Sequence, residues 1–266
     1  MTPRALTIAG SDSGGGAGVQ ADLKTFTVFG VYGMSVVTAI TAQNTAKVRG
    51  VHLVPPGFVQ AQLDAVLSDI GTDATKTGML PTAAIVTTVA QVARERRLDK
   101  LVVDPVFCAG NGTPLVEPAT IDAVRAELMP LALVITPNRT EAETLAGIKV
   151  DSITGMREAA RILIREGARG VLVKGGHFDG DEAVDIFDDG RAVQELRSGR
   201  IATRHTHGTG CQLSAAITAG LASGLPLSEA LIQAKRFISL AIANSVAIGK
   251  GNGPANPLAW LEPKFR

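Results

Sequence analysis

The sequence has few of the features that mark extracellular, membrane or nucleic-acid-binding proteins. It has only two cysteines in 266 residues, too few for a disulfide framework or a paired set of metal ligands. The apolar stretch at residues 5–10 is too short for a secretory signal, and no apolar run approaches the roughly 20 residues that a membrane span needs. The formal charge of +1 gives no general attraction to nucleic acid or acidic partners. We therefore expect a cytoplasmic protein without nucleic-acid or membrane partners.

Apolar residues, by contrast, are plentiful, at 45% of the chain, which is enough for a substantial core. The chain is long for one domain and short for two, and it has no internal repeat, low-complexity segment or linker. Because large α/β domains often reach this length, we expect a single domain over residues 1–266.

Short apolar runs alternate with helical patterns along the chain. The runs show little polar alternation, which is typical of strands in a sheet that is covered on both faces. We expect strands at residues 4–10, 35–41, 101–106, 132–136 and 170–176. This alternation of strands and helices predicts an α/β fold, a three-layer αβα sandwich with a mostly parallel central sheet.

Local signals place three further elements. Apolar residues at helical spacing predict a helix over residues 59–70, behind Pro55 and Pro56, and a second helix over 227–245. The turn sequence at residues 188–190 predicts a hairpin within 182–198.

The polar and glycine-rich motifs follow the predicted strands. In open α/β sheets, ligands bind beyond the carboxyl ends of the strands, so we expect these motifs to lie at one edge of the sheet. They are "GSDSGGGAG" (10–18), "TAQNT" (41–45), "KTGM" (76–79), "DP" (104–105), "TPNRTEAE" (136–143), "KGGH" (174–177) and "HGTGC" (207–211).

The first of these motifs is glycine-rich but matches neither common nucleotide fingerprint. Val19 stands where a dinucleotide fingerprint needs its last glycine, and the Gly-Lys-Ser/Thr of a P-loop is absent. Glycines let a backbone approach a ligand closely, and the following helix start attracts anions. The alternative is a flexible turn in which Asp12 or Ser13 caps the helix.

The "HGTGC" motif is more specific. Backbone N–H groups of successive residues at a helix start form an anion-binding cradle, here over residues 208–211. A thiol at this place, Cys211, is expected to have a lowered pKa and to act as a base or nucleophile. The alternatives are a small buried hydrophobic residue and a zinc ligand with His205 and His207, although no second cluster completes a zinc site.

Taken in order, the motifs "GSDSGGGAGVQADLKTF", "TAITAQNT", "KTGML", "VVDPV", "TPNRTEAE", "VLVKGGH" and "HGTGCQLSAAI" resemble those of hydroxymethylpyrimidine/phosphomethylpyrimidine kinases of thiamine biosynthesis. These enzymes belong to the ribokinase-like superfamily. The resemblance covers essentially the whole chain. It implies phosphorylation of 4-amino-5-hydroxymethyl-2-methylpyrimidine, and then of its monophosphate, with ATP and Mg²⁺. It also implies a homodimer.

The resemblance assigns roles at the phosphate end of the site. Cys211 corresponds to the base that deprotonates the substrate hydroxyl, where most of the superfamily has an aspartate. Backbone amides of the same loop would stabilise the transferred phosphoryl group, since phosphoryl transfer depends on positioning and charge neutralisation. The other catalytic residues are Gly208, Thr209, Gly210 and Lys174, the ATP-binding residues are Lys174, Asn138 and Thr209, and the Mg²⁺ ligands are Asp104 and Glu141.

Each of these residues also has an ordinary structural interpretation. Lys174 could be an exposed lysine at a strand end, although Gly175 and Gly176 would permit close approach of a ligand. The Asp104-Pro105 pair is common in turns, and Asn138 with Glu141 matches a helix-capping box.

The resemblance places Gly10, Asp12, Gln43 and Met79 at the substrate. The Gln43 amide offers one donor and one acceptor, which match a ring nitrogen and the exocyclic amine of an aminopyrimidine. Met79 would pack on the flat ring. The alternatives are a glutamine that is satisfied by backbone groups and a core methionine.

Two departures from the family pattern affect specificity. Phe107, Cys108 and Gly110 replace part of a Met-Val-Ala-Lys segment, so the loop that covers the substrate differs. Gln212 replaces a threonine and loses a hydroxyl contact to phosphate or metal, whereas the helix start should survive. Two other functions stay open: a pyridoxal kinase of the cysteine-containing type and a non-catalytic pyrimidine-binding regulator.

Overall fold

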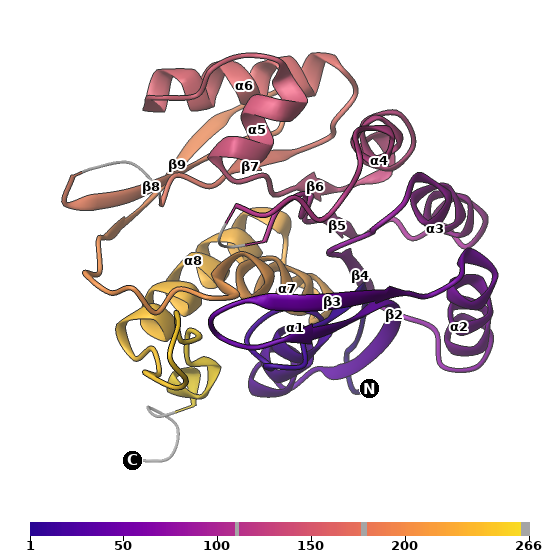
Figure 1. Ribbon diagram of the computed structural model, residues 1–266. Coiled ribbons are helices and arrows are strands. Elements are labelled where there is room, and N and C mark those ends of the chain that lie inside the picture. The colour runs from indigo at the N-terminus through magenta and orange to yellow at the C-terminus, as the bar shows by residue number, and fades with distance from the viewer. Residues whose placement is uncertain (110–111, 177–179, 262–266) are drawn as a thin grey trace.

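The computed structural model describes residues 1–109, 112–176 and 180–261. Nine strands of these residues form one sheet in the order β3-β2-β1-β4-β5-β6-β7-β8-β9 (Figure 1). The strands are β1 Arg4–Ser11, β2 Tyr32–Gln43, β3 Val48–Leu53, β4 Ala74–Thr77, β5 Leu101–Val103, β6 Val134–Ile135, β7 Val171–Val173, β8 Glu182–Asp188 and β9 Val193–Gly199. The six central strands, which are β2, β1, β4, β5, β6 and β7, pair in parallel. Strand β3 at one edge and strands β8 and β9 at the other add antiparallel pairs.

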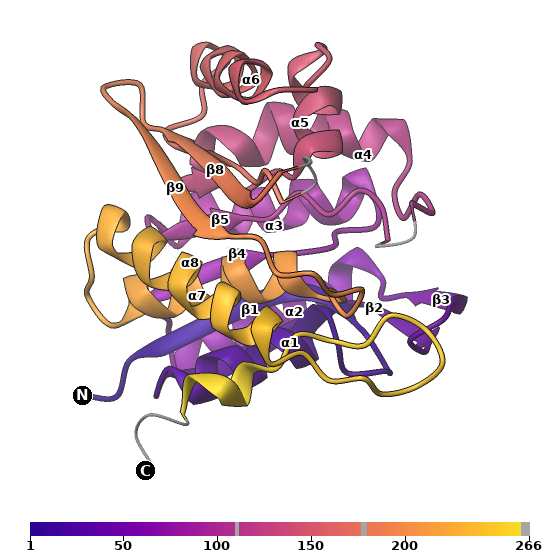
Figure 2. The same ribbon diagram turned by 90° about the vertical axis from the view of Figure 1, so that its left-hand side faces the viewer.

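Helices cover both faces of the sheet. The helices are α1 Gly18–Val28, α2 Pro56–Asp69, α3 Ala83–Glu95, α4 Pro118–Ala123, α5 Arg139–Ala146, α6 Ile153–Arg165, α7 Thr209–Ala222 and α8 Leu227–Ala243. Figure 2 shows α7 and α8 in front of the strands, with α3 behind them. The buried apolar residues form two clusters, one between the sheet and helices α2, α3, α5 and α6, and the other between the sheet and α1, α7 and α8. The predicted three-layer αβα sandwich is confirmed.

The second cluster holds the C-terminal part of the chain in place. Phe29, which follows α1, stacks on Trp260 with ring centroids 5.3 Å apart, and Phe237 of α8 meets both rings edge-on. Such aromatic pairs stabilise a core by about 0.5–1.5 kcal/mol beyond the area that they bury. They fix α8 against the end of α1, and α7 packs against both helices and against β1, β4 and β5.

The predicted elements are present with shifted ends. The five predicted strands are found, but β5, β6 and β7 have only two or three residues each. The hairpin is confirmed as β8 and β9, and α2 begins at Pro56 as expected. Strands β3 and β4 were not predicted, and α8 ends at Ala243 instead of reaching Ser245. Of the described helices, none combines the length and apolar character that crossing a bilayer requires.

Candidate active site

The predicted gathering of motifs at one edge of the sheet is observed. The turns after β1, β4, β5 and β7 and the start of α7 all lie at the carboxyl ends of the parallel strands. Contacts between these segments form two groups. One is centred on the glycine-rich loop after β1 and is called the glycine-loop side, and the other is centred on Lys174 and is called the lysine side. Cys211 lies between the two groups.

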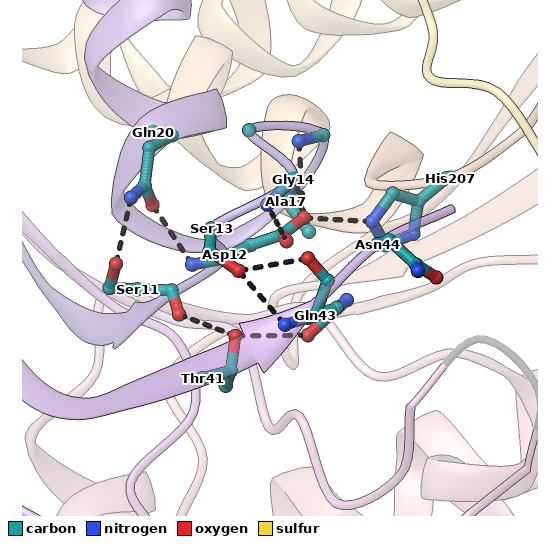
Figure 3. A network of polar contacts seen from close by, with 12 residues as sticks. Ser11, Asp12, Ser13, Gly14, Ala17, Gln20, Thr41, Gln43, Asn44 and His207 are labelled. Atoms are coloured by element: carbon teal, nitrogen blue, oxygen red, sulfur yellow. Dashed lines mark hydrogen bonds and ion pairs between the residues drawn. The ribbon is translucent and has the colours of Figure 1, made fainter. Parts of the chain in front are cut away.

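Asp12 organises the glycine-rich loop that follows β1 (Figure 3). Its carboxylate accepts hydrogen bonds from the backbone N–H groups of Gly14, Gly16 and Ala17 at 2.8, 3.1 and 2.9 Å. It also pairs with Nε2 of His207 at 2.9 Å. Burial favours the neutral acid, but these hydrogen bonds outweigh it and hold the pKa of Asp12 below its usual value.

The hydrogen bond between Asp12 and His207 joins the glycine loop to the loop that precedes α7. The two loops also touch through backbone alone, because a Cβ atom at Gly208 would lie 1.8 Å from the carbonyl oxygen of Gly16. Gly208 has a φ of 75°, a conformation that glycine adopts without strain. The helix-cap interpretation of Asp12 is not what the structure shows, since Ala17 is the N-cap of α1 and has no side-chain cap.

Gln43 lies at the end of β2, and its backbone is fixed by Ser13 (Figure 3). The Ser13 hydroxyl donates to the Gln43 carbonyl and accepts from the Gln43 N–H, both at 2.8 Å. The side-chain oxygen Oε1 accepts a hydrogen bond from Thr41 at 3.3 Å. Within the described residues, Nε2 of Gln43 has no protein partner, so this amide keeps a donor for a ligand.

Met79 packs against Gly10, so two of the predicted substrate residues are neighbours. A Cβ atom at Gly10 would lie 2.5 Å from Cε of Met79. The backbone carbonyl of Met79 accepts a hydrogen bond from Thr38 at 2.7 Å. Only a residue without a side chain at position 10 leaves this space for the methionine.

On the lysine side, Lys174 follows β7 directly and donates to Oδ1 of Asp104 at 2.9 Å. Asp104 also accepts hydrogen bonds from Thr136 at 3.0 Å and Ser214 at 3.2 Å. Burial opposes both charges, but their mutual attraction outweighs it, so the pKa of Lys174 is raised and that of Asp104 is lowered. The lysine is therefore not the exposed strand-end residue of the alternative interpretation, because only 13% of its side chain is accessible.

Lys174 reaches the start of α7. A Cβ atom at Gly210 would lie 3.2 Å from Nζ of Lys174. Gly175 has a packing role instead of the predicted openness to ligand, because a Cβ there would lie 1.9 Å from the Val184 carbonyl oxygen. No atom lies within 4 Å of the corresponding position at Gly176. His177 of the same motif is outside the described residues.

Asn138 and Glu141 form the capping box that their spacing matches. The Asn138 side chain accepts from the Glu141 N–H at 3.0 Å, and Oε2 of Glu141 accepts from the Asn138 N–H at 2.7 Å. Burial raises the pKa of Glu141 to about 7, assisted by Asp104 and opposed by Lys174. Two buried carboxylates that repel each other beside Lys174 offer the hard oxygen ligands that Mg²⁺ prefers.

Cys211 lies in the first turn of α7. In the part of the chain that the structure describes, the N–H groups of Gly210 and Cys211 have no acceptor, as expected for the first turn of a helix.

The predicted lowering of the thiol pKa is wrong. Burial, together with Asp22 and Asp104, raises the pKa of Cys211 to about 11, although Lys76 and the Gly18 backbone oppose this.

An ion pair that sequence reasoning missed lies beneath this cysteine. Nζ of Lys76 on β4 contacts Oδ1 of Asp22 on α1 at 2.9 Å, and both side chains are fully buried. Thr7 donates to the other oxygen of Asp22 at 2.6 Å. One feature of the sequence could have indicated this ion pair. Lys76 stands between two threonines, in "TKT" (75–77), at a place where an apolar strand would be expected.

The two departures from the family pattern lie at different places. Gln212 is buried, and its Nε2 donates to the carbonyl oxygen of Ala255 at 3.2 Å, so it packs on the C-terminal segment while α7 still begins at Thr209. Phe107 is buried and Cys108 is exposed. Gly110 is outside the described residues.

No group of three or more His, Cys, Asp or Glu side chains that could hold a metal occurs among the residues described.

Comparison with known proteins agrees with the order of the motifs. The chain is 52% identical over 260 residues to the hydroxymethylpyrimidine/phosphomethylpyrimidine kinase of Rhizobium meliloti, covering 96% of this chain and 97% of that protein. It is 51% identical to a thiamine biosynthesis bifunctional protein of Geobacter sulfurreducens over 97% of this chain, but spans only 52% of that longer protein.

A solved structure extends the comparison to the fold. The pyridoxal kinase of Bacillus subtilis, in an ADP complex, superposes with a TM-score of 0.93 at 40% identity, and all of both chains is covered. This similarity confirms the ribokinase-like form of the sandwich. The family model for phosphomethylpyrimidine kinases matches residues 12–256, which include every site residue discussed above except Gly10 and Thr7. A match of this extent, with relatives of about half identical sequence, shows that the chain belongs to the phosphomethylpyrimidine kinase family.

Proposed function

We propose that this protein transfers the γ-phosphoryl group of ATP to the hydroxyl of 4-amino-5-hydroxymethyl-2-methylpyrimidine, and then to the resulting monophosphate, in thiamine biosynthesis. One observation carries the proposal. The start of α7 presents two unpaired N–H groups and the Cys211 thiol beside the ammonium group of Lys174. Anionic phosphoryl oxygens fit this arrangement, and a hydroxyl beside the thiol would be in position to attack.

The residues divide the chemistry between them. The loop from Gly208 through Thr209 and Gly210 to Cys211 would stabilise charge on the transferred group, chiefly through the N–H groups of Gly210 and Cys211, since the Thr209 N–H donates to the Thr206 carbonyl oxygen. Lys174 would neutralise the nucleotide phosphates. Asn138 lies next to Lys174 through a backbone bridge and would contact the nucleotide. Cys211 would take the hydroxyl proton as the new oxygen–phosphorus bond forms and the bond to ADP breaks. The ADP complex of the Bacillus subtilis relative supports the use of ATP.

Asp104 and Glu141 would hold Mg²⁺, in part through water, as this ion prefers. The ion would neutralise charge on the phosphates. The donor set supports this role, because both side chains are buried carboxyl groups at the phosphate end.

Glu141→Gln is expected to shift the Mg²⁺ dependence of kcat to higher concentration. Glutamine keeps the capping box, since it can also accept from the Asn138 N–H, but it has no charge to attract the ion. The measurement is kcat against free Mg²⁺, with the exposed Glu158→Gln as the control. An unchanged Mg²⁺ titration would restrict Glu141 to helix capping.

Gln43, Met79, Gly10 and Asp12 would form the substrate side. The free donor of the Gln43 amide would bind the pyrimidine, and Met79 would pack on the ring. Asp12 would act on the substrate through the loop that it organises, because three backbone amides and His207 already engage its carboxylate.

Gln43→Ala is expected to raise the KM for the pyrimidine far more than the KM for ATP. Loss of the paired amide should cost about 1–3 kcal/mol, because the buried ring nitrogen and amine of the substrate lose the donor Nε2 and the acceptor Oε1. Steady-state kinetics with each substrate varied would measure this, with Gln91→Ala at an exposed position of α3 as the matched control. Equal increases in both KM values would make Gln43 a structural residue.

Mass spectrometry of the products tests the function directly. Purified protein, MgATP and the hydroxymethylpyrimidine should give the monophosphate and then the diphosphate, with ADP. Failure to form either product, by a folded protein that binds ATP, would contradict the proposal and favour the non-catalytic regulator.

A second candidate is a pyridoxal kinase activity, favoured by the full-length similarity to the Bacillus subtilis pyridoxal kinase. The same site would then phosphorylate the hydroxymethyl group of a pyridine ring. Comparison of kcat/KM for pyridoxal and the hydroxymethylpyrimidine separates the two activities, and a higher value for pyridoxal would reverse the assignment.

We further propose a cytoplasmic homodimer, as the resemblance implies. The edge strand β3 supports a dimer, because Val51 and Leu53 on it are each 45% exposed and Ile40 of the adjacent β2 is 52% exposed. An unpaired strand edge with apolar side chains readily binds a second copy. Both cysteines are free thiols, in agreement with a reducing compartment.

A further inference from the structure

A buried ion pair outside the proposed chemistry lies next to the turn that carries Lys174. Nζ of Lys235 on α8 contacts Oδ2 of Asp185 on β8 at 2.8 Å, and only 10% and 6% of the two side chains are accessible. Asp185 faces the same side of the sheet as Phe187, two residues along β8, which packs in the cluster that contains α8. Removing two charges from water is costly, so a buried ion pair is weak support for stability by itself. Its position beside the site offers another explanation.

The second oxygen of Asp185 binds the backbone of that turn. Oδ1 accepts a hydrogen bond from the N–H of Gly175 at 2.9 Å, and this bond is buried. The ladder between β7 and β8 has already ended here, with Val173 opposite Ile186 as its last pair. The Asp185 carboxylate therefore attaches the turn to β8 at the point where the pairing of the two strands stops.

The backbone of the turn is also held on its other side. The N–H of Lys174 donates to the carbonyl oxygen of Pro137 at 2.8 Å, in the segment that follows β6. Strands β6 and β8 are the two neighbours of β7 in the sheet. Two consecutive N–H groups, those of Lys174 and Gly175, are thus bound to the elements on either side, and the backbone from which the Lys174 side chain starts is fixed between them.

We propose that Asp185, held by Lys235, is a positioning residue for Lys174: by binding the Gly175 N–H it fixes the backbone from which the lysine reaches the nucleotide phosphates. The inference deepens the proposed function and rests on it, because the contact of Lys174 with ATP belongs to that proposal. In this role neither Asp185 nor Lys235 touches a reacting atom. Their effect falls on nucleotide binding and phosphoryl transfer, and not on binding of the pyrimidine.

The chemistry of the pair suits this role. A hydrogen bond from an N–H group to a carboxylate is shorter and about twice as strong as one to a neutral acceptor. A carboxylate in the core needs a partner for its remaining oxygen, and Lys235 supplies one from 50 positions further along the chain. The ion pair therefore makes a strong acceptor available at a buried amide that carries the turn.

Two double variants separate positioning from stability. The apolar variant, Asp185→Leu/Lys235→Met, replaces the ion pair by apolar groups of similar size, leaves no unpaired buried charge and removes the acceptor of the Gly175 N–H. The amide variant, Asp185→Asn/Lys235→Gln, also removes both charges, but its asparagine oxygen can still accept from Gly175 while its asparagine NH₂ donates to the glutamine. Asp185→Asn alone would leave Lys235 without its ionic partner and serves only as a comparison.

Two quantities are measured on each folded variant: the dissociation constant of the non-hydrolysable analogue β,γ-methylene-ATP, by calorimetry, and kcat/KM for ATP. The apolar variant should lose about 10-fold to 10²-fold in both, since misplacing a contacting group by about 1 Å has an effect of this size. Its KM for the pyrimidine should not change. The amide variant should recover most of the loss, because it restores the hydrogen bond to Gly175. Circular dichroism and the melting temperature establish that each variant is folded.

Arg4→Met/Asp73→Leu is the matched control. Asp73 likewise accepts from a backbone N–H, that of Arg4, at 2.8 Å and pairs with the guanidinium of the same residue at 2.9 Å, but at the amino ends of β1 and β4. This variant should lower the melting temperature and leave the affinity for the analogue unchanged.

A folded apolar variant that binds the analogue as tightly as the parent would overturn the inference. An amide variant that loses as much affinity as the apolar variant would overturn it as well. If the apolar variant loses affinity and the amide variant recovers it, but neither they nor the parent phosphorylate the pyrimidine, the proposed function fails and the positioning role of Asp185 stands.

Discussion

Cys211→Ala should lower turnover by about 10²–10⁴, the usual effect of removing a positioned general base. Alanine suits the run of small residues in α7, so the fold should be retained. ATP binding should change little, because the amides of the loop belong to the backbone and Lys174 is untouched. The measurements are kcat, the ATP dissociation constant and circular dichroism.

Cys108→Ala is the natural control for this variant. Cys108 is exposed and lies in the loop that departs from the family pattern, so its replacement should leave kcat within a few-fold of the parent. Bound ATP and pyrimidine should also protect Cys211 from alkylation more than Cys108. Cys211→Asp would supply the base used by most of the superfamily and should recover part of the activity. A fully active Cys211→Ala enzyme would refute the assignment and leave the thiol a packing residue.

Lys174→Met should lower kcat/KM for ATP by about 10²–10³, comparable with the loss of one preorganised group that stabilises the transition state. The same change leaves Asp104 buried and unpaired, since only 1% of that side chain is accessible. Removing one partner of a buried ion pair costs about 3–5 kcal/mol. We therefore expect a lower melting temperature as well as lower activity.

Two further variants separate these effects. Lys174→Met/Asp104→Asn removes the unpaired charge and should regain much of the stability without regaining the activity. Lys149→Met changes a lysine whose side chain is 80% exposed and should alter neither property. A single Lys174→Met variant with normal kcat/KM for ATP would show that the lysine holds Asp104 in place but does not contact the nucleotide.

Much of the fold could be predicted because its central strands are apolar and its helices are periodic. Strand β4 could not, since three of the four residues of "ATKT" are polar and yet all four are buried. One of them, Lys76, is stable there only because Asp22 lies opposite it, 54 positions away in the sequence. No local pattern carries that information. Strand β3 was missed for the opposite reason, because it is exposed and lacks the buried apolar run that marks the others.

The position of the site was predictable, but its electrostatics were not. Strand ends are visible in the sequence, so Lys174 and Asp104 were expected at one edge, and they form an ion pair there. The pKa of Cys211 was predicted in the wrong direction because the helix end was the only influence visible. Its burial and the two carboxyl groups near it depend on how α1, α7 and β4 pack together.

Helix α7 has a consequence for how this protein loses activity on heating. Every residue from Gln212 to Ala222 is buried, and Cys211 is in the first turn of the same helix. Elements of this kind open last, whereas many enzymes carry their reactive residues on segments that melt early. Thermal inactivation should therefore coincide with loss of the whole fold, and residual activity after a heat pulse can report global stability when variants are screened.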